Sequence, residues 1–283
     1  MCSVLEIARQ SYYAWRKRKP SQREKENKEL LKEIKKIHSD SMQTYGSPRI
    51  HQALKAKGYR VGRGRVARLM RENDMEAIQK RKRKWTTDSN HYFPISPNLL
   101  NRQFEVSAKD QTWLVNLTYV DTDEGWLYLA AVLDAYSRKI VGWSMDRTMS
   151  RKLCMDALTM AVDRRQPKAG LIHHSDRGSQ YASGDYQAML EKNGMVSSMS
   201  RKGNCWDNAP MESFFRTLKR ESLHRFTFKT RNEEKEKVFE YIDTFNHRKR
   251  THSALGFMSP ELYQTQEAKV ARFRVSKKSE QGH

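Results

Sequence analysis

The stretch QTWLVNLTYVDTDEGWLYLAAVLDAYSRKIVGW, residues 111–143, is the most strand-like part of the chain. Three apolar runs begin in it, Trp113–Val120, Trp126–Leu133 and Lys139–Met145, with the short connections DTDEG and DAYSR between them. Runs of this composition with such short connections predict three antiparallel strands joined by hairpins. The first run carries a polar amide, Asn116, in its middle, where a strand of a sheet core ordinarily carries an apolar side chain.

The residues that follow predict alternating helices and strands. Residues 151–165 and 184–193 have helical apolar spacing, whereas Leu171–His174 and Met195–Met199 are short apolar runs. A strand meander followed by such an alternation predicts an α/β domain with a mixed five-stranded sheet flanked by helices.

The region before residue 111 predicts an all-α region and a linker. Ser21–His38 is amphipathic, and residues 45–73 show the pattern helix, glycine-containing turn, helix, with arginines on the second helix. Such a pair is typical of a DNA-binding helix-turn-helix, although solvated surface arginines explain the charge equally well. Residues 80–110 have no periodicity and begin with a cationic run, which could follow a phosphate backbone or only span a gap.

Composition points to a polyanionic partner. The chain has 283 residues and a net charge of +21, and residues 1–110 hold 26 basic and 12 acidic side chains. This balance favours nucleic acid, with a merely basic soluble surface as the alternative. The absence of long apolar runs and of a leader pattern predicts a cytoplasmic protein without a membrane span, and three scattered cysteines predict neither disulfides nor structural zinc.

Two carboxylates stand where chemistry is expected. Asp176 directly follows a short apolar strand, and Glu212 lies in the first turn of a predicted helix, with Arg216 and Lys219 on the same helical face. A turn residue and a helix-dipole partner would explain each carboxylate separately. Two carboxylates with two cations would also suit a divalent metal held beside a phosphate, and Lys219 is the stronger candidate for the phosphate contact.

Several long motifs resemble one family. HHSDRGSQY (173–181), SMSRKGNCWDNAPMESFFRTLKRE (198–221) and FNHRKRTHSALGFMSPELY (245–263) are similar to the integrase-type transposases of bacterial insertion sequences, in particular to the catalytic part of the IS-three family. YGSPRIHQAL, GRGRVARLM and the opening VLEIARQSYYAWRKR resemble the N-terminal helix-turn-helix region of that family. The resemblance extends from about Val4 to Tyr263.

The resemblance implies a ribonuclease-H-like, retroviral-integrase-like fold with an Asp, Asp, Glu triad. Asp176 and Glu212 match the second and third acids. The first acid of the family lies in a W-x-x-D-x-T-Y strand, and Asn116 occupies its position here, between Trp113 and Thr118. An amide keeps the size but loses the charge, so the chain is expected to be a catalytically disabled transposase. Asp134 is a weak candidate to replace the missing acid, since the turn before Ser137 already gives it a use.

The same resemblance implies the chemistry and the partners. Two Mg²⁺ ions, with Mn²⁺ as a substitute, would be held at Asn116 (as Asp), Asp176 and Glu212 for cleavage at the element ends and transfer of the 3′-hydroxyl strand. The expected partners are double-stranded DNA of the terminal inverted repeats and target, a second copy of the chain, and the upstream-frame protein of the element. A non-enzymatic DNA-binding regulator is the alternative, and a nuclease of RNA–DNA hybrids is a third.

The expected domains are residues 1–79 for the helix-turn-helix region, 80–110 for the basic linker, 111–264 for the catalytic domain and 265–283 for a basic tail. Trp206, just before Glu212, is open to two interpretations, a stacking contact with DNA or a core anchor. The expected DNA-contacting residues are Arg49, Arg63, Arg65, Arg68, Lys80, Arg81, Lys82, Arg83, Lys84, Arg201, Lys202, Arg216 and Lys219.

Overall fold

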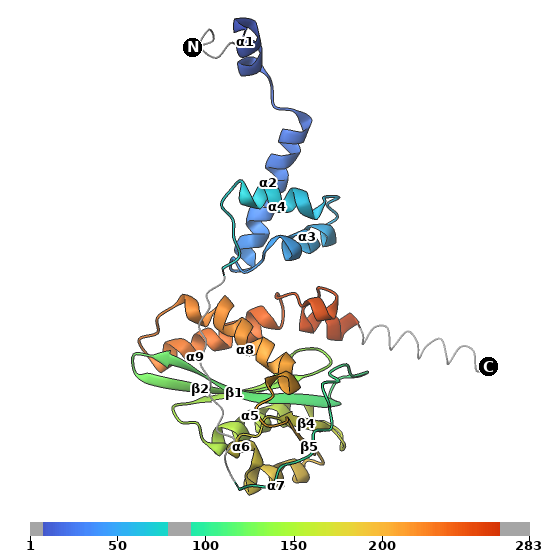
Figure 1. Ribbon diagram of the computed structural model, residues 1–283, viewed down its shortest axis with the longest axis vertical. Helices are drawn as coiled ribbons and strands as arrows, with labels where there is room; N and C mark the ends of the chain where they lie inside the picture. Colours follow the sequence, from blue (N-terminus) through green and yellow to red (C-terminus); the bar gives the residue numbers. More distant parts are fainter. Residues whose placement is uncertain (1–7, 79–91, 267–283) are drawn as a thin grey trace, which may run out of the picture. The chain divides into compact units, whose positions relative to one another are not determined.

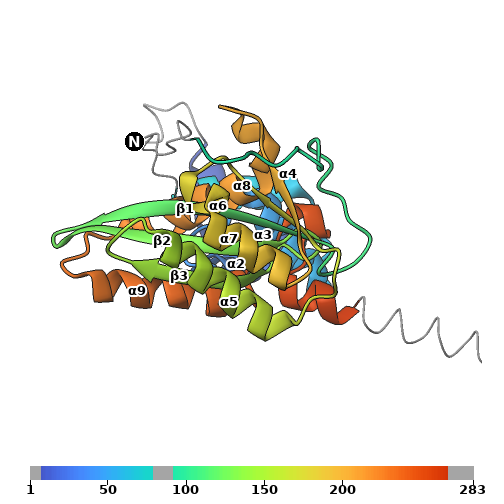
Figure 2. The ribbon, with the colours of Figure 1, turned by 90° about the horizontal axis from the view of Figure 1, so that it is seen from below.

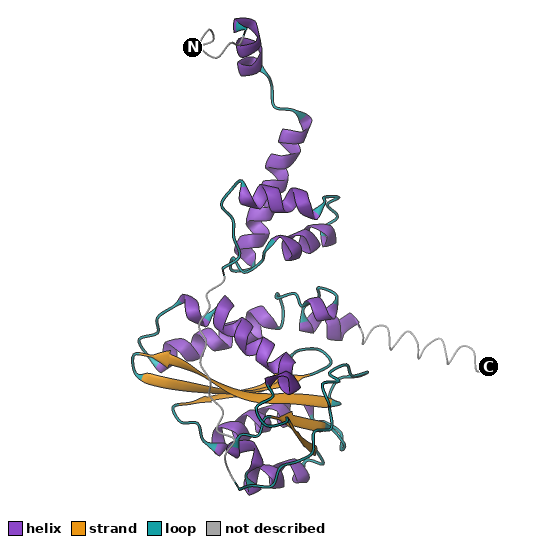
Figure 3. Cartoon of the chain, viewed as in Figure 1, coloured by secondary structure: helices purple, strands orange, loops and turns teal. Residues whose placement is uncertain are grey.

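A computed structural model describes residues 8–78 and 92–266, and its chain forms two compact units, Met1–Ala77 and Ile78–His283. The first unit is entirely helical among its described residues, whereas the second mixes strands with helices (Figure 3). Each unit has its own buried core.

The first unit packs three helices together after a short exposed helix, α1 (Arg9–Lys17). They are α2 (Gln22–Asp40), α3 (Ser47–Ala56) and α4 (Arg63–Arg71). Ser21 caps α2 through a reciprocal pair of hydrogen bonds with Glu24, which fixes where the helix begins. After α3, Gly58 adopts a φ of +87°, a backbone conformation that glycine favours, and the chain turns toward α4.

The second unit is built on one five-stranded sheet with the strand order β3-β2-β1-β4-β5. Strands β1 (Thr112–Thr122), β2 (Gly125–Asp134) and β3 (Ile140–Asp146) form an antiparallel meander. Strands β4 (Ile172–Ser175) and β5 (Val196–Met199) extend the sheet in parallel from the other side of β1. The predicted ribonuclease-H-like mixed sheet is confirmed, and β1 lies at its centre.

The first hairpin is tighter than its sequence suggests. Thr122 pairs with Gly125, so only Asp123 and Glu124 connect β1 to β2, and both strands continue beyond their predicted ends. Gly125 adopts a φ of +99°, which closes this two-residue turn.

Helices cover both faces of the sheet (Figures 1 and 2). One face carries α5 (Arg151–Arg165), α6 (Ser179–Ala182) and α7 (Gly184–Lys192), and the other carries α8 (Ala209–Glu221) and α9 (Arg231–Phe239), which continues into a π-helical segment, Glu240–Asn246. Three short 3₁₀ turns, Cys205–Asn208, Leu223–Arg225 and Ser253–Leu255, complete the described elements.

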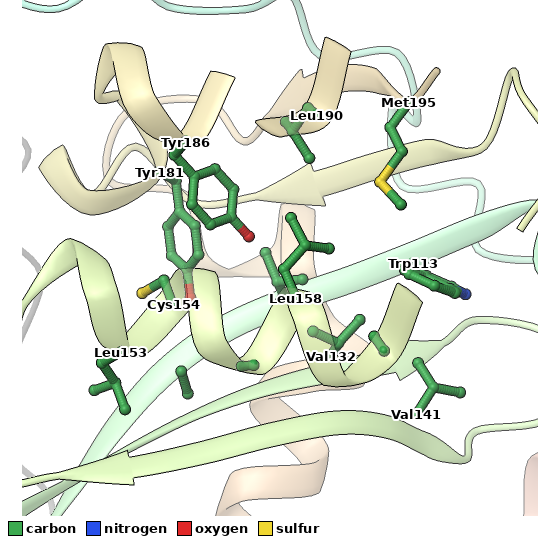
Figure 4. Close-up of a cluster of buried hydrophobic side chains, with 14 of the residues drawn as sticks. Trp113, Val132, Val141, Leu153, Cys154, Leu158, Tyr181, Tyr186, Leu190 and Met195 are labelled. Atoms are coloured by element: carbon green, nitrogen blue, oxygen red, sulfur yellow. The ribbon is translucent and has the colours of Figure 1, made fainter. Parts of the chain in front are cut away.

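The main core lies between the sheet and α5, α6 and α7. Trp113 and Val132 of the sheet meet Leu158 of α5 and Tyr186 of α7 there (Figure 4). Gly142 on β3 allows α5 to approach closely, since a Cβ at this position would overlap the backbone of Ala157 and Ala161. Trp113 and Val115 of the central strand β1 belong to this core, and the opposite face of β1 carries the candidate site.

Candidate active site

Asn116 lies at the centre of the sheet with its side chain away from the main core. Side chains alternate along β1, so Trp113 and Val115 enter the core with α5, whereas Asn116 belongs to the face that carries α8. Only 7% of Asn116 is exposed. Its Nδ2 donates a hydrogen bond to Oε1 of Glu212 at 3.0 Å, and its Oδ1 accepts one from the backbone N–H of Leu117 at 2.7 Å.

Asp176 lies at the end of β4, beside Asn116. Because β1 and β4 are parallel and Leu114 pairs with His174, the residues two positions further along each strand are Asn116 and Asp176. Oδ1 of Asp176 accepts a hydrogen bond from the N–H of Gly178 at 2.9 Å, which orients the carboxylate in the turn after the strand.

Glu212 reaches the site because the start of α8 is fixed to β1. Nδ2 of Asn208, the residue before α8, donates to the backbone oxygen of Val115 at 2.8 Å. Pro210 lies in the first helical turn, where its missing N–H costs nothing, and Glu212 follows in the same turn. The structure therefore brings residues 116, 176 and 212 together from a strand, a strand end and a helix.

The carboxyl of Glu212 is electrostatically perturbed. Partial desolvation raises its pKa, the hydrogen bond from Asn116 opposes that rise, and the charge of Asp176 adds to it, although the residue as a whole keeps access to solvent. Lys219 and Arg216 act in the opposite direction to Asp176 and favour the ionised carboxylate. A carboxylate near a second carboxylate and two cations is typical of a site for metal ions and phosphate.

The donor set, as the sequence stands, contains two carboxylates and an amide. No group of three His, Cys, Asp or Glu side chains suited to a metal occurs among residues 8–78 and 92–266. Asn116 presents an N–H donor to Glu212, whereas an aspartate there would present a third charged oxygen ligand. The site thus fits oxygen-ligated divalent ions when residue 116 is Asp, and fits them less well as Asn.

Asp134 has a structural role instead. Its Oδ2 accepts from the backbone N–H of Ser137 at 3.0 Å, and its Oδ1 accepts from the N–H of Asp110 at 3.1 Å. Asp134 pairs with Trp113, at the end of the β1–β2 ladder that lies opposite the hairpin turn. Its carboxylate stabilises the turn before Ser137, in agreement with the structural use that the sequence suggested for it.

Lys219 is close enough to Glu212 for the two charges to interact. Its Nζ is 5.0 Å from the ring centroid of Tyr119 on β1, within range of a cation–π contact. Burial lowers the pKa of Lys219, and the charges of Glu212 and Glu234 act against that decrease. Arg216, one turn nearer to Glu212, is exposed.

Glu234 on α9 is a buried acid that the sequence did not single out. It is 1% exposed, and its Oε2 has no hydrogen-bond partner within the described part of the chain. Burial raises its pKa to about 8, Lys219 acts to lower it, and Asp121 adds to the rise. The run RNEEKEKVF reads as a solvated charged helix, and nothing in it distinguishes Glu234 from its neighbours.

The loop before α8 is held by Asp207. This residue is 0% exposed, and Arg201 donates to it through both Nε at 2.8 Å and Nη2 at 2.7 Å. Arg102 donates to Oδ1 at 2.9 Å, so Arg201 and Arg102 together hold the pKa of Asp207 well below its usual range. Trp206, its neighbour, is 69% exposed, which makes the core-anchor interpretation wrong.

The expected DNA-contacting residues of the first unit differ in how they are used. Arg63 and Arg68 are exposed on α4, and Arg49 lies over the ring of Tyr45 at 5.3 Å. Arg65, in contrast, holds α4 to α2 by donating to Asn27 at 2.8 Å and by an ion pair with Glu26 at 3.2 Å. The basic run Lys80, Arg81, Lys82, Arg83 and Lys84 lies outside the described residues.

Family models match three segments of the chain. An HTH-like domain matches residues 25–83, and an integrase core domain matches residues 106–205 and, in a second model, 212–267. These matches agree with the α2–α4 unit and with the sheet-containing unit in which residues 116, 176 and 212 lie. No described helix has the length and apolar character needed to cross a membrane.

Curated relatives share most of the chain. It is 48% identical over 263 residues to the "Insertion element IS600 uncharacterized 31 kDa protein" of Shigella sonnei, covering 93% of this chain and 97% of the relative. It is 41% identical over 266 residues to "Transposase InsF for insertion sequence IS3A" of Escherichia coli, covering 93% and 92%. Among solved structures, the HTLV-2 integrase catalytic core in complex with magnesium has a TM-score of 0.40 at 13% identity, covering 51% and 91%.

Proposed function

The chain belongs to the insertion-sequence transposases that combine an HTH-like domain with an integrase core domain, and we propose that it is a member whose metal-dependent centre lacks the first carboxylate. The observation that carries this proposal is the 3.0 Å hydrogen bond from Asn116 Nδ2 to Glu212 Oε1. This bond supports the proposal because it joins residue 116 to Glu212, which we propose as the third acid of the site. The proposed reaction of the complete site is cleavage at the element ends and transfer of the 3′-hydroxyl strand.

Asp176, Glu212 and residue 116 as Asp would hold two Mg²⁺ ions, with Mn²⁺ as a substitute. When bound there, the ions would supply positive charge beside the scissile phosphate and would favour an ionised nucleophile. With Asn at position 116 one negative charge is missing, so we expect weaker ion binding and little or no reaction.

The other residues of the site position DNA. Lys219 keeps its ammonium beside Tyr119, on the helical face that carries Glu212, and we propose that it contacts a phosphate oxygen next to the cleavage point. Arg216, which is exposed one turn closer to Glu212, supports the same strand from the solvent side. We further propose that the exposed arginines of α4, Arg63 and Arg68, contact duplex DNA, and that Lys202 contacts backbone phosphate.

Two element ends must be brought together for strand transfer, so we propose at least a dimer on DNA, with the upstream-frame protein as a further partner. A regulator that binds DNA without cutting it is the second candidate function, and the amide at position 116 is the observation that favours it.

The decisive experiment restores the acid. The original chain, Asn116→Asp, and the matched control Asn101→Asp, which adds the same charge at an exposed loop position, are compared on paired element ends with Mg²⁺ or Mn²⁺. We expect cleavage and strand transfer only with Asn116→Asp, and no reaction when Asp176→Asn is added to it. Equal DNA binding by all variants with no reaction from any would favour the regulator, and cleavage confined to RNA–DNA hybrids would refute the transposase proposal.

A further inference from the structure

A large aromatic side chain stands in solvent beside the candidate active site. Trp206 is 69% exposed in the 3₁₀ turn Cys205–Asn208, whereas most tryptophans in folded proteins are largely buried. Between residues 197 and 225 it is the one large hydrophobic side chain that is exposed. Neither the core of the unit nor the proposed chemistry accounts for it.

The backbone under Trp206 is rigidly held. The neighbouring Asp207 accepts five hydrogen bonds: two from the side chain of Arg201, one from the N–H of Arg201 at 2.9 Å, one from Arg102, and one from Asn98 at 3.0 Å. A fully buried carboxylate with this many charged and polar donors fixes the turn. Trp206 is therefore held in position as an exposed side chain on an ordered support, and its exposure does not come from a loose loop.

The support is fixed to the catalytic strand. Asn208, two residues after Trp206, donates to the backbone oxygen of Val115, the residue that precedes Asn116. At the other end of the loop, Nε of Arg177 donates to the backbone oxygen of Ser200 at 2.8 Å, and Arg177 directly follows Asp176. Both ends of the loop are thus bonded to segments that carry catalytic positions, and α8 with Glu212 begins immediately after it.

We propose that Trp206 stacks against an unpaired nucleobase next to the scissile phosphate. This inference rests on the proposed transposase function and names a contact of that same site. An indole offers a flat face to any base, and the exposed Lys202 of the loop suits the backbone of a single strand. Stacking of this kind would keep the end of the DNA strand unpaired at the cleavage point, and it would depend little on which base is stacked.

The test measures binding of the original chain, so it does not depend on catalysis. The probes are a blunt duplex and the same duplex with a three-nucleotide unpaired 3′ extension that contains 2-aminopurine, whose fluorescence decreases when it stacks. Each is titrated with the original chain, Trp206→Ala, Trp206→Phe and the control Trp15→Ala. Trp15 is a suitable control because it is 66% exposed but belongs to α1 in the other unit.

We expect the original chain to bind the extended probe more tightly than the blunt one and to quench its fluorescence. Trp206→Ala should lower that preference roughly 5- to 150-fold, the range that corresponds to loss of one base–aromatic stack. Trp206→Phe should keep most of it, and Trp15→Ala should not change the ratio between the two probes. Thermal unfolding of Trp206→Ala should match the original chain, since the side chain is exposed.

Three outcomes for Trp206→Ala would overturn the inference. The ratio of its affinities for the extended and blunt probes could be unchanged, or its binding to both probes could weaken equally. Its oligomeric state in sedimentation could also change while the affinity ratio stays the same, which would assign Trp206 to a protein contact. Failure of the proposed function looks different. In that case Asn116→Asp would not react on paired ends, whereas the probe ratio would still depend on Trp206.

Discussion

Replacing Asn116 by Asp should destabilise the metal-free protein. In Asn116→Asp, a donor–acceptor pair 3.0 Å apart becomes two carboxylates, whose repulsion is about 1.4 kcal/mol in bulk water and about 5.5 kcal/mol at an effective dielectric constant of about 20. Glu212 is exposed, so the lower part of that range applies, and loss of the hydrogen bond adds about 1 kcal/mol. We expect the free energy of unfolding to fall by about 2 to 3 kcal/mol at neutral pH and low salt.

The destabilisation should depend on pH and on metal. A carboxyl whose folded-state pKa is raised, as that of Glu212 already is, keeps the folded state stable at low pH and loses that contribution as the pH rises through the raised pKa. The penalty of Asn116→Asp should therefore be small near pH 4 and full near pH 7.5. A metal site with a Kd of about 0.1 to 1 mM would recover about 1.4 to 2.7 kcal/mol in about 10 mM Mg²⁺.

Calorimetric unfolding of the original chain, Asn116→Asp and Asn101→Asp, between pH 4 and pH 8 and with or without Mg²⁺, measures both effects. Asn101→Asp controls for net charge, because it lies in an exposed loop. If Asn116→Asp were as stable as Asn101→Asp without metal and gained no more from Mg²⁺, residue 116 would not be a metal-ligand position.

Three further predictions concern other residues. Glu234→Gln should stabilise the chain increasingly above pH 4.5, by about 3 kcal/mol at pH 7. The reason is that the buried acid, with a pKa of about 8, stays protonated in the folded state while it ionises in the unfolded chain, so it opposes folding as the pH rises. Denaturant titrations that show the same stability difference at pH 5 and pH 8 would contradict this. Lys219→Gln in the Asn116→Asp background should lower the rate of strand transfer roughly 10²-fold with little change in DNA affinity, and Arg216→Gln should lower it less. Single-turnover kinetics measure both effects. Equal rate losses for the two variants would refute the separate role of Lys219. Gly142→Ala should reduce the free energy of unfolding by about 1 to 3 kcal/mol, since its methyl group would overlap the α5 backbone, and an unchanged melting temperature would mean that α5 can move away from β3.

The sequence predicted the sheet because its strands are apolar runs that end at recognisable turns. The helix Arg151–Arg165 was also predicted with its observed bounds, since Ser150 caps its start and its apolar spacing is regular. The extent of the first hairpin was not predicted, because DTDEG contains polar residues that still pair across β1 and β2. Pairing of Thr122 with Gly125 depends on the turn geometry at Gly125, which composition alone does not specify.

The sequence predicted which residues belong to the candidate site, but it did not predict which of them contact one another. Asn116, Asp176 and Glu212 were singled out by motif resemblance, whereas their proximity depends on the β1–β4 register and on the bond from Asn208 to Val115. Two of the five hydrogen bonds to Asp207, those from Asn98 and Arg102, join segments more than 100 residues apart, so no local pattern could indicate them. Arg65 shows the converse: its place among surface arginines suggested DNA contact, whereas it joins α4 to α2.

The amide at the centre of the sheet has a consequence for competition between copies of such a protein. Asn116 differs from aspartate by one NH₂ group in place of one oxygen, so we expect the fold and the proposed DNA-contacting surfaces to be the same with either residue. The missing negative charge also reduces repulsion of an incoming phosphate when no metal is present. Under the proposed function, such a chain would occupy element ends for long periods without releasing products. In a cell that also contained an active copy, it would act as a dominant brake on the movement of both.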